Sequence, residues 1–378
     1  MPWGTRRGGA ERRLLTIVEG LEPSRVQADL IFLEEGPFAR EAVSVGARSS
    51  VLAAGRLRDW RAFGRTVRSL VRYLEREQPD VLLSWGSKPQ LYGGTAAALA
   101  ATDPVNVWWM LEIPARQWLP VLATLLPAEA IGCSSRHVAG EQRRLMLPRR
   151  PTFVIHPGVH HPRQVPAAER EKLRSALGIP HARLVVGTVG RLQPWKNQHI
   201  VIDAIGHLVR GGRDVHAIVV GGTSHARSLG YEEELHQRAK DAGLAARISF
   251  AGHQSDVDPY YALFDVFVLG SQREPFGLVV LEAMARGVPV VAVSSAGPAE
   301  ILEHGRTGWL VRTASEQQFA EAIAALADQP GLRRQMAVSA RKTYERKFTV
   351  NRMVSEFQQE MERLAGAAAK PTCVRSEL

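Results

Sequence analysis

Short apolar segments alternate with helix-like segments along almost the whole chain, and this alternation restricts the possible folds more than any other feature. Short apolar runs bounded by glycine, proline or aspartate are typical of buried strands. Strands that alternate with helices form parallel sheets with helices on both faces. The sequence therefore predicts an α/β fold with doubly wound parallel sheets. The predicted strands are 28–33, 42–45, 81–85, 105–109, 130–135 and 153–155, then 184–190, 217–222, 248–252, 266–269, 288–293 and 308–311.

A chain of 378 residues is long enough for two domains, each with its own apolar core. A polar, proline-bearing linker between Gly158 and Pro166 interrupts the alternation, which then restarts. We therefore expect an amino-terminal domain over 1–158 and a carboxy-terminal domain over 167–348. A last helix is expected over 350–364, and residues 365–378 carry no pattern and are expected to be disordered.

The net charge of +10 and the isoelectric point near 10.0 favour acidic partners such as nucleotide diphosphates, anionic lipid surfaces or nucleic acid. The arginines are scattered and no stacking platform is visible, which argues against nucleic acid. The two cysteines, Cys133 and Cys373, form neither a metal nor a redox pattern, so a reducing compartment is expected. No secretory signal or membrane-spanning segment is visible. We expect a cytoplasmic protein, at most peripheral to the inner face of a membrane.

The segment 273–287 has the pattern of an anion-binding site. The apolar run 266–269 predicts a buried strand, and residues 277–286 have the length of a helix. A helix that starts after a strand presents backbone N–H groups and the positive end of its dipole to an anion. Glu274 lies before this helix and Glu282 within it, and carboxylates accept strong hydrogen bonds from sugar hydroxyls. The pattern therefore predicts a nucleotide-sugar site.

A second loop carries two cations. The strand 184–190 ends at Gly190, and Arg191 and Lys196 follow it before the next helix. Ligands bind at the carboxyl ends of strands in open α/β sheets, and two cations there can neutralise a departing diphosphate. Lys196 is one of only seven lysines among 48 basic residues, so it departs from the chain's preference for arginine. Gly221, after the following strand, is a candidate wall for the ribose or base.

These motifs resemble the Glu-x7-Glu signature and the Arg-x4-Lys spacing of retaining glycosyltransferases of the GT-B fold, family 4 or glycosyl transferases group 1. The resemblance runs from Gly187 to about Leu310, and more loosely from Gly8 to Gly158. It implies two Rossmann-like domains facing across a cleft, with the donor on the carboxy-terminal domain and the last helix packed on the first. It also implies transfer of a hexose-type sugar from a nucleotide diphosphate to a glycan, lipid-linked or small-molecule acceptor, with retention of configuration.

The resemblance also implies roles for the residues of the second half. Glu282 would take the ribose hydroxyls, whereas the donor sugar and distal phosphate would be held by Glu274 and by the amides of Phe276, Gly277 and Leu278. No metal or other cofactor is implied, because Arg191 and Lys196 already supply positive charge at the diphosphate.

An Asp-x-Asp sequence at 256–258 matches the metal motif of a different glycosyltransferase fold. Pro259 follows it directly, and an aspartate followed by proline is typical of a helix start. We therefore interpret Asp256 and Asp258 as a helix cap and not as a metal site.

The first half departs from the family in two places. Gly8 and Gly9 open a helix, either as a plain turn or as a phosphate contact, but Met1–Arg7 is no strand, so the first strand is apparently missing. Many relatives have a histidine, or sometimes an aspartate, just after the strand that matches 105–109, where this chain reads Met110-Leu111-Glu112. Glu112 is either an ordinary loop carboxylate or a replacement that holds a donor hydroxyl or orients the acceptor.

The segment 60–77 predicts a helix with one apolar face and one arginine face. The arginine face is either solvated or a peripheral contact with anionic lipid. Its arginines are Arg61, Arg65, Arg68, Arg72 and Arg76.

Other functions would also use paired glutamates or a sugar-nucleotide site. A glycosidase would need its two carboxyl groups on opposite sides of the scissile bond, whereas Glu274 and Glu282 share one loop-and-helix unit. A GT-B sugar-nucleotide epimerase, or a catalytically weakened sugar-nucleotide-binding protein, is the remaining alternative to a transferase.

Overall fold

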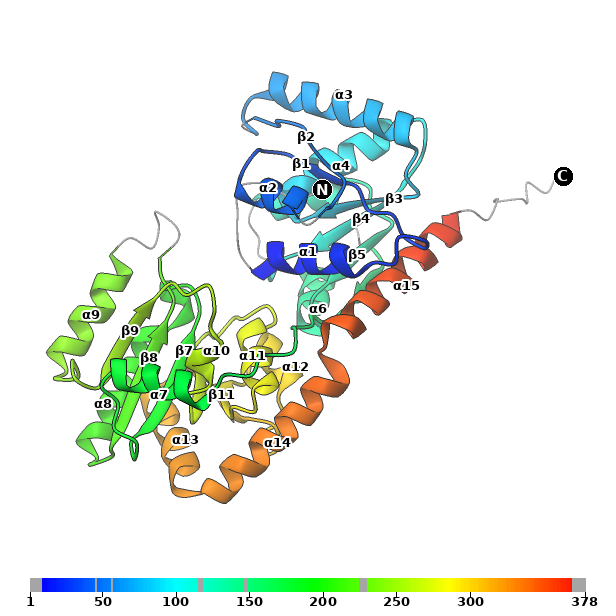
Figure 1. The fold of residues 1–378 in the computed structure, drawn as a ribbon. Coiled ribbons are helices and arrows are strands. Elements are labelled where there is room, and N and C mark those ends of the chain that lie inside the picture. Colours follow the sequence, from blue (N-terminus) through cyan, green and yellow to red (C-terminus); the bar gives the residue numbers. More distant parts are fainter. Residues whose placement is uncertain are drawn as a thin grey trace. The chain divides into compact units, whose positions relative to one another are not determined.

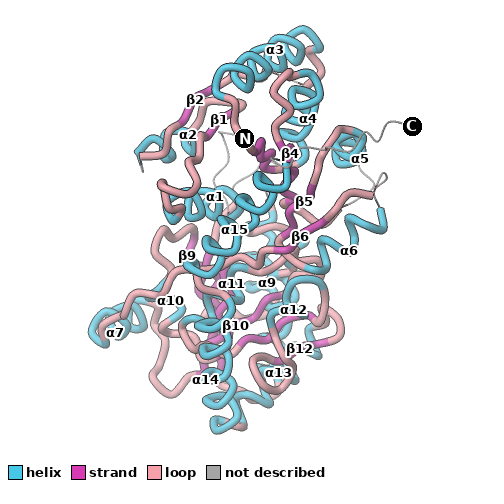
Figure 2. The backbone as a smooth tube through the Cα atoms, turned by 90° about the vertical axis from the view of Figure 1, so that its right-hand side faces the viewer, coloured by secondary structure: helices cyan, strands magenta, loops and turns pink. Residues whose placement is uncertain are grey.

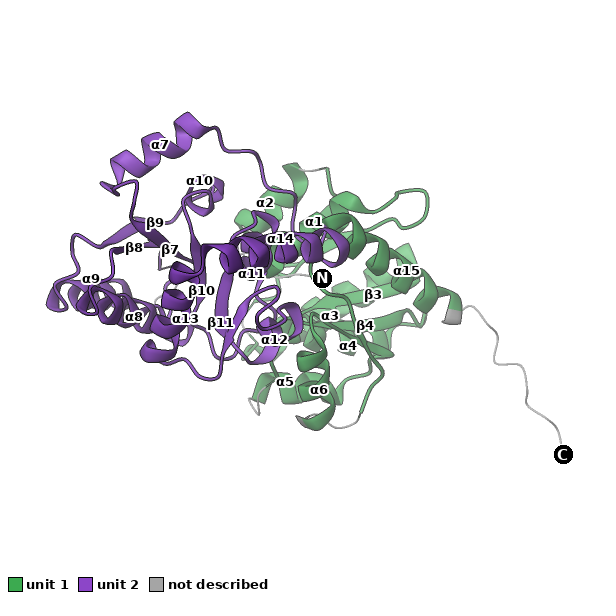
Figure 3. Ribbon diagram, turned by 90° about the horizontal axis from the view of Figure 1, so that it is seen from below, with its two compact units in different colours: residues 1–157, 350–378 green, residues 158–349 purple. Residues whose placement is uncertain are grey.

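The computed structural model describes residues 9–44, 46–55, 57–114, 118–145, 149–223 and 230–368. The chain forms two compact units: unit 1 comprises residues 1–157 and 350–378, and unit 2 comprises residues 158–349 (Figure 3). Each unit is built on parallel strands with helices packed against them (Figures 1 and 2). The predicted α/β class with two Rossmann-like units is confirmed.

Unit 1 has a four-stranded parallel sheet in the order β3-β4-β5-β6 and a separate parallel pair, β1-β2. One apolar cluster lies between these strands and helices α1, α2 and α15, and two more lie on the side of α3, α4, α5 and α6. Its elements are α1 (Gly9–Gly20), β1 (Leu30–Phe32), α2 (Pro37–Ser44), β2 (Ser49–Val51), α3 (Trp60–Glu77), β3 (Val81–Trp85), α4 (Ser87–Leu99), β4 (Val105–Met110), α5 (Trp118–Leu125), β5 (Ala130–Cys133), α6 (Arg136–Leu145), β6 (Thr152–Val154) and α15 (Val350–Ala368).

Two predictions for unit 1 are wrong in detail. The expected strand 42–45 belongs instead to helix α2 as far as Ser44, because Phe38, Ala39 and Ala42 share one buried helical face. The expected tail 365–378 begins too early, because helix α15 continues to Ala368, where three alanines, the strongest helix formers, outweigh Gly366. Residues 369–378 lie outside the described part of the chain.

The start of unit 1 is described only from Gly9, which begins α1. Gly8 and residues 1–7, where the sequence predicts that the family's first strand is missing, lie outside the described residues. Strands β1 and β3 contribute side chains to the same two apolar clusters, yet they belong to different sheets. A cavity of about 550 Å³ is lined by both strands and by helices α1 and α15.

Unit 2 has a six-stranded parallel sheet in the order β12-β11-β10-β7-β8-β9. Alternate residues of the central strand β7 enter two cores, Val186 one and Val185 the other, so the sheet is buried on both faces. The elements are α7 (Ala167–Ala176), β7 (Leu184–Val189), η1 (Pro194–Lys196), α8 (Gln198–Arg210), β8 (Val215–Val220), α9 (Tyr231–Asp241), β9 (Ile248–Gly252), α10 (Asp258–Tyr261), β10 (Val266–Leu269), α11 (Leu278–Ala285), β11 (Val290–Val293), α12 (Ala296–Ile301), β12 (Trp309–Val311), α13 (Glu316–Asp328) and α14 (Pro330–Lys347).

The strand order of unit 2 reverses direction at β7. From β7 the chain first adds β8 and β9 on one side, then β10, β11 and β12 on the other. A reversal of this kind opens a crevice outside the carboxyl ends of the two strands that flank it. The position of the site in unit 2 therefore follows from the order of its strands. Among the described residues, no helix combines the length and the apolar character needed to cross a membrane.

Candidate active site

The loops after β7 and β10 meet at the strand reversal of unit 2. The two strands pair through Val186 with Val266 and Gly187 with Phe267. Arg191 and Lys196 lie on the loop that leaves β7, and Glu274 lies on the loop that leaves β10. Two motifs separated by about eighty residues of sequence are thereby brought to one edge of one sheet.

Lys196 and Glu274 form an ion pair with a distance of 2.5 Å between Nζ and Oε2. Their side chains are only 14% and 11% exposed, so both charges are largely removed from water. Removing one member of such a pair leaves the other charge uncompensated, which makes the pair a strong mutual constraint. The Lys196 ammonium also lies 4.3 Å from the ring centroid of Trp195, a cation–π contact. The sequence placed both residues in the site but did not predict that they pair.

Backbone contacts hold the two loops together. Asn197 donates from Nδ2 to the carbonyl oxygen of Gly270 at 3.0 Å. A Cβ added at Gly270 would lie 2.8 Å from the Asn197 carbonyl oxygen, so only glycine lets the loops approach so closely. The carbonyl of Glu274 accepts from the Gly297 N–H at 3.0 Å, which ties the second loop to α12. The ion pair therefore rests on loops whose backbones are fixed.

Helix α11 begins where the sequence predicts an anion site. Gly277 has φ +102°, a conformation that favours glycine, and Leu278 is the first helical residue. The N–H groups of a first helical turn have no preceding helix carbonyl as partner. Phe276, the residue before Gly277, is buried and packs against Phe348, and this contact holds the turn in place. The positive end of α11 thus lies directly after the loop that carries Glu274.

Gly190 and Gly221 lie in contact at the ends of β7 and β8. The Gly190 N–H donates to the Val220 carbonyl at 2.9 Å. A Cβ added at Gly221 would lie 1.9 Å from the Gly190 carbonyl oxygen, and Gly221 has φ +147°. The structure therefore shows a packing reason for Gly221 that the sequence pattern did not reveal.

Arg191 is exposed beside this contact. Its carbonyl oxygen accepts from Gln198 Nε2 at 2.9 Å, which fixes the loop backbone. Within the described residues, its guanidinium forms no ion pair, in contrast to Lys196. A cation with no protein partner at the carboxyl end of a strand is suited to an anionic ligand.

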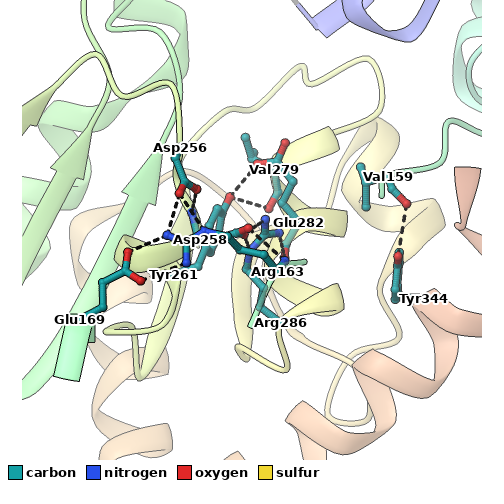
Figure 4. Close-up of polar contacts among 10 residues, drawn as sticks. All are labelled: Val159, Arg163, Glu169, Asp256, Asp258, Tyr261, Val279, Glu282, Arg286 and Tyr344. Atoms are coloured by element: carbon teal, nitrogen blue, oxygen red, sulfur yellow. Dashed lines mark hydrogen bonds and ion pairs between the residues drawn. The ribbon is translucent and has the colours of Figure 1, made fainter. Parts of the chain in front are cut away.

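Glu282 lies one helical turn into α11 and is half-buried. Its Oε2 lies 3.1 Å from the hydroxyl of Tyr261 (Figure 4). Tyr261 could not be identified as a site residue from the sequence, because no local signal relates a residue of α10 to one of α11.

Asp256 and Asp258 are engaged by arginines. Asp256 Oδ1 accepts the Asp258 N–H at 3.0 Å, the local contact expected at a helix start. Asp256 Oδ2 also accepts from Arg163, and Asp258 pairs with Arg286 (Figure 4). Among the described residues, no group of three or more metal-ligating side chains is present. The predicted cap is therefore wrong in detail: Val257 precedes the first turn of α10 and no side chain caps that turn, while both aspartates are held by arginines from far along the chain.

The remaining predicted site residues belong to unit 1. Glu112 is exposed on the loop after β4, and Leu111 before it packs over Gly86 at the end of β3. Gly9 is the exposed first residue of α1. Both lie at the starts or ends of elements, as the sequence predicts.

Two family models match the chain in succession and together span both units. The model described as Glycosyltransferase Family 4 matches residues 7–163, and the model described as Glycosyl transferases group 1 matches residues 169–343. Both models describe glycosyltransferases, and the chain is a glycosyltransferase. The second match contains the loops after β7 and β10 with their ion pair.

Individual glycosyltransferases are similar over different lengths. The lipopolysaccharide core biosynthesis glycosyltransferase LpsE of Rhizobium meliloti is 26% identical over 93% of this chain and 95% of its own length. The mannosyltransferase LpsB of the same organism is 34% identical, but over 47% of this chain and 51% of its own length. LpsB thus matches about half of this chain and half of its own length, whereas LpsE matches nearly the whole of both chains.

One solved structure is similar to this chain over both units. The crystal structure of Anabaena Alr3699/HepE in complex with UDP is 26% identical, has a TM-score of 0.84 and covers 96% of this chain and 98% of that one. The same protein is also known in complex with UDP-glucose, at a TM-score of 0.80. These matches confirm the GT-B class and a nucleotide-sugar glycosyltransferase function, and they do not favour the epimerase or binding-protein alternative.

Proposed function

We propose that unit 2 binds a nucleotide diphosphate hexose at the loops after β7 and β10, and that the enzyme transfers the hexose to a glycan or lipid-linked acceptor with retention of configuration. The observation that carries this proposal is the shielded Lys196–Glu274 pair at the strand reversal. The UDP and UDP-glucose complexes of HepE support a uridine nucleotide as the first donor to test.

In this proposal each group at the strand reversal has one role. The Lys196 ammonium has three donor hydrogens, so it can hold Glu274 and a phosphate oxygen together. Arg191 and the first N–H groups of α11 face the remaining diphosphate charge, which grows as the glycosidic bond breaks. Glu274 accepts hydrogen bonds from the hexose, and Glu282 accepts them from the ribose. Gly190 and Gly221 form the wall beside the nucleoside.

A donor screen tests the proposal. A nucleotide sugar that binds only the folded state raises the melting temperature, so wild-type protein is scanned with UDP-, GDP- and ADP-hexoses. The donor that stabilises the protein should also release its nucleoside diphosphate, slowly to water and faster with acceptor. Stabilisation by a donor without any release would make this chain a binding protein and not an enzyme.

We propose that transfer needs no metal. The cations at the diphosphate are already Arg191 and Lys196, and the two aspartates of the Asp-x-Asp sequence are occupied by Arg163 and Arg286. Nucleoside diphosphate release should therefore change less than about twofold when a chelator is added, since charge stabilisation comes from the protein. Strict dependence on Mg²⁺ or Mn²⁺ would return Asp256 and Asp258 to the role of metal ligands.

We propose that Glu112 orients the acceptor or a donor hydroxyl. It is exposed at the carboxyl end of β4, the end of a parallel strand at which ligands bind. Glu112→Gln should leave donor affinity nearly intact and slow transfer by about ten- to a hundredfold, the usual cost of a lost positioning group. Leu111→Ala should cost less. Unchanged turnover in Glu112→Gln, measured at saturating donor, would make Glu112 an ordinary loop residue.

A peripheral contact with anionic lipid is proposed for the helical layer of unit 1. Arg65, Arg68 and Arg72 are exposed along α3 and form no ion pairs within the described chain. Helix α4 packs against both α3 and α5, and α5 leaves its apolar side chains Trp118, Leu122 and Leu125 exposed. Helix α4 thus has a basic helix and an exposed apolar helix as neighbours, a combination that suits an anionic membrane surface.

Sedimentation with vesicles checks this surface. Reversal of Arg65, Arg68 and Arg72 to glutamate should reduce binding to phosphatidylglycerol vesicles by at least about tenfold, since each basic residue contributes about 1 kcal/mol near such a surface. Reversal of the exposed Arg334, Lys342 and Arg346 of α14 makes the same change in net charge elsewhere. Equal losses of vesicle binding in both variants would mean that the net charge of the protein, and not the α3 surface, determines its binding to anionic lipid.

A further inference from the structure

The hydroxyl of Tyr261, on α10, contacts the carboxylate of Glu282, on α11 (Figure 4). Its hydroxyl is 3.1 Å from Glu282 Oε2 and 3.1 Å from the carbonyl oxygen of Val279. The ring is fully buried, and burial raises the pKa of Tyr261 well above its ordinary value. The hydroxyl therefore keeps its proton and acts as the donor toward the carboxylate, the stronger of the two acceptors.

The ring of Tyr261 is itself held by Arg286. The guanidinium carbon lies 4.7 Å from the ring centroid, in a cation–π contact. Arg286 Nη1 also donates to the Glu282 carbonyl at 2.8 Å, so one side chain contacts both the tyrosine and the glutamate backbone. The guanidinium pairs with Asp258, and the two side chains are only 14% and 13% exposed.

Asp258 is in turn fixed by Arg163, in the first segment of unit 2. The Arg163 N–H donates to Asp258 Oδ2 at 3.1 Å, while the Arg163 guanidinium bonds Asp256 at 2.9 Å from Nε and Glu169 at 2.6 Å from Nη2. Figure 4 shows the resulting chain of contacts from Arg163 through Asp258 and Arg286 to Tyr261 and Glu282. The network ends at the Glu282 carboxylate, which is the group proposed to accept the ribose hydroxyls of the donor.

We propose that Tyr261 is a positioning residue for ribose recognition, which fixes the Glu282 carboxylate in the orientation that accepts the ribose hydroxyls. The inference rests on the proposed role of Glu282. A carboxylate offers about four lone-pair positions, so it accepts from Tyr261 and from a ribose diol together. A glutamate side chain that is already ordered loses less rotamer freedom when the ligand binds, and this preorganisation increases affinity. Arg286, Asp258 and Arg163 keep the tyrosine in place.

Ribose discrimination tests this role. The probe is whichever of UDP, GDP and ADP binds wild-type protein most tightly, compared by calorimetry with its 2′,3′-dideoxy analogue on the same preparation. Wild-type protein should favour the ribonucleotide by about tenfold or more, as expected for hydrogen bonds to a charged group. Tyr261→Phe keeps the ring and should lower this ratio at least about threefold, while kcat at saturating donor changes little. A ratio measured on one preparation does not depend on the folded fraction.

The matched control is Tyr344→Phe, which removes a buried tyrosine hydroxyl bonded to the Val159 carbonyl at 3.2 Å, in a contact separate from the bonds around Glu282 (Figure 4). It should leave the ratio unchanged. If Tyr261→Phe does not fold, Arg286→Lys loosens the contact above the ring and should lower the ratio partially.

Three outcomes distinguish a failure of the positioning role of Tyr261 from a failure of the proposed ribose contact of Glu282. Loss of discrimination in both Glu282→Gln and Tyr261→Phe supports it. Loss in Glu282→Gln with the full ratio retained in Tyr261→Phe overturns the positioning role and leaves the ribose role of Glu282 intact. A wild-type ratio retained in Glu282→Gln overturns both, because Glu282 then does not contact the ribose.

Discussion

Lys196→Ala and Arg191→Ala are each expected to lower kcat/KM for sugar transfer about a hundredfold or more, on the order of 3 kcal/mol of lost charge stabilisation. Both cations lie on the loop after β7, where the departing diphosphate gains charge in this account. The two variants should differ in stability. Lys196→Ala leaves the shielded Glu274 carboxylate without its partner, whereas Arg191 is exposed and forms no ion pair in the described chain. Only Lys196→Ala should therefore also lower the melting temperature.

Steady-state kinetics and thermal melts check both expectations. Lys172→Ala is the matched control, because Lys172 is an exposed lysine of the same unit on α7. It should leave both transfer and melting temperature unchanged. Near-normal turnover in both Lys196→Ala and Arg191→Ala would show that these two cations do not stabilise the departing diphosphate.

Glu274→Gln is the second substitution with a large expected effect. The amide keeps the size of the side chain but loses the charge that accepts sugar hydroxyls and pairs with Lys196. We expect kcat to fall about a hundredfold, since loss of one preorganised charged contact typically costs that much. Affinity for the nucleoside diphosphate without its sugar should change little, because Glu274 is assigned to the hexose.

Calorimetry with the nucleoside diphosphate and kinetics with the intact donor separate these effects. Glu316→Gln, at an exposed position in the first turn of α13, controls for the loss of one negative charge in unit 2. Equal losses of affinity for nucleoside diphosphate and for the intact donor in Glu274→Gln would place this carboxylate at the nucleotide and not at the sugar.

The fold of unit 2 could be predicted from sequence because its central strands, β10 above all, are apolar runs that are buried on both faces and separated by clear helices. Unit 1 is less regular, and there the sequence misassigned residues 42–45. Three apolar residues fit a strand or a helix equally well, and only the burial of Phe38 one turn earlier decides for α2.

The site was predictable as far as local motifs reach. The loops with Arg191, Lys196 and Glu274 follow strands, and the strand order alone brings them together. The sequence could not predict the partners across the sheet: the Lys196–Glu274 ion pair, the hydroxyl of Tyr261 on Glu282 and the arginines on Asp256 and Asp258. Those contacts depend on tertiary packing between segments that share no periodic pattern.

A crystal structure of the enzyme with its selected nucleotide sugar would locate each part of the donor. We expect diphosphate oxygens within about 2.7–3.2 Å, ordinary hydrogen-bond distance, of Lys196 Nζ and the first N–H groups of α11. We also expect the ribose at Glu282 and the hexose at Glu274. A donor bound away from the loops after β7 and β10, or one whose diphosphate is held through a metal on Asp256 and Asp258, would contradict the proposed donor site.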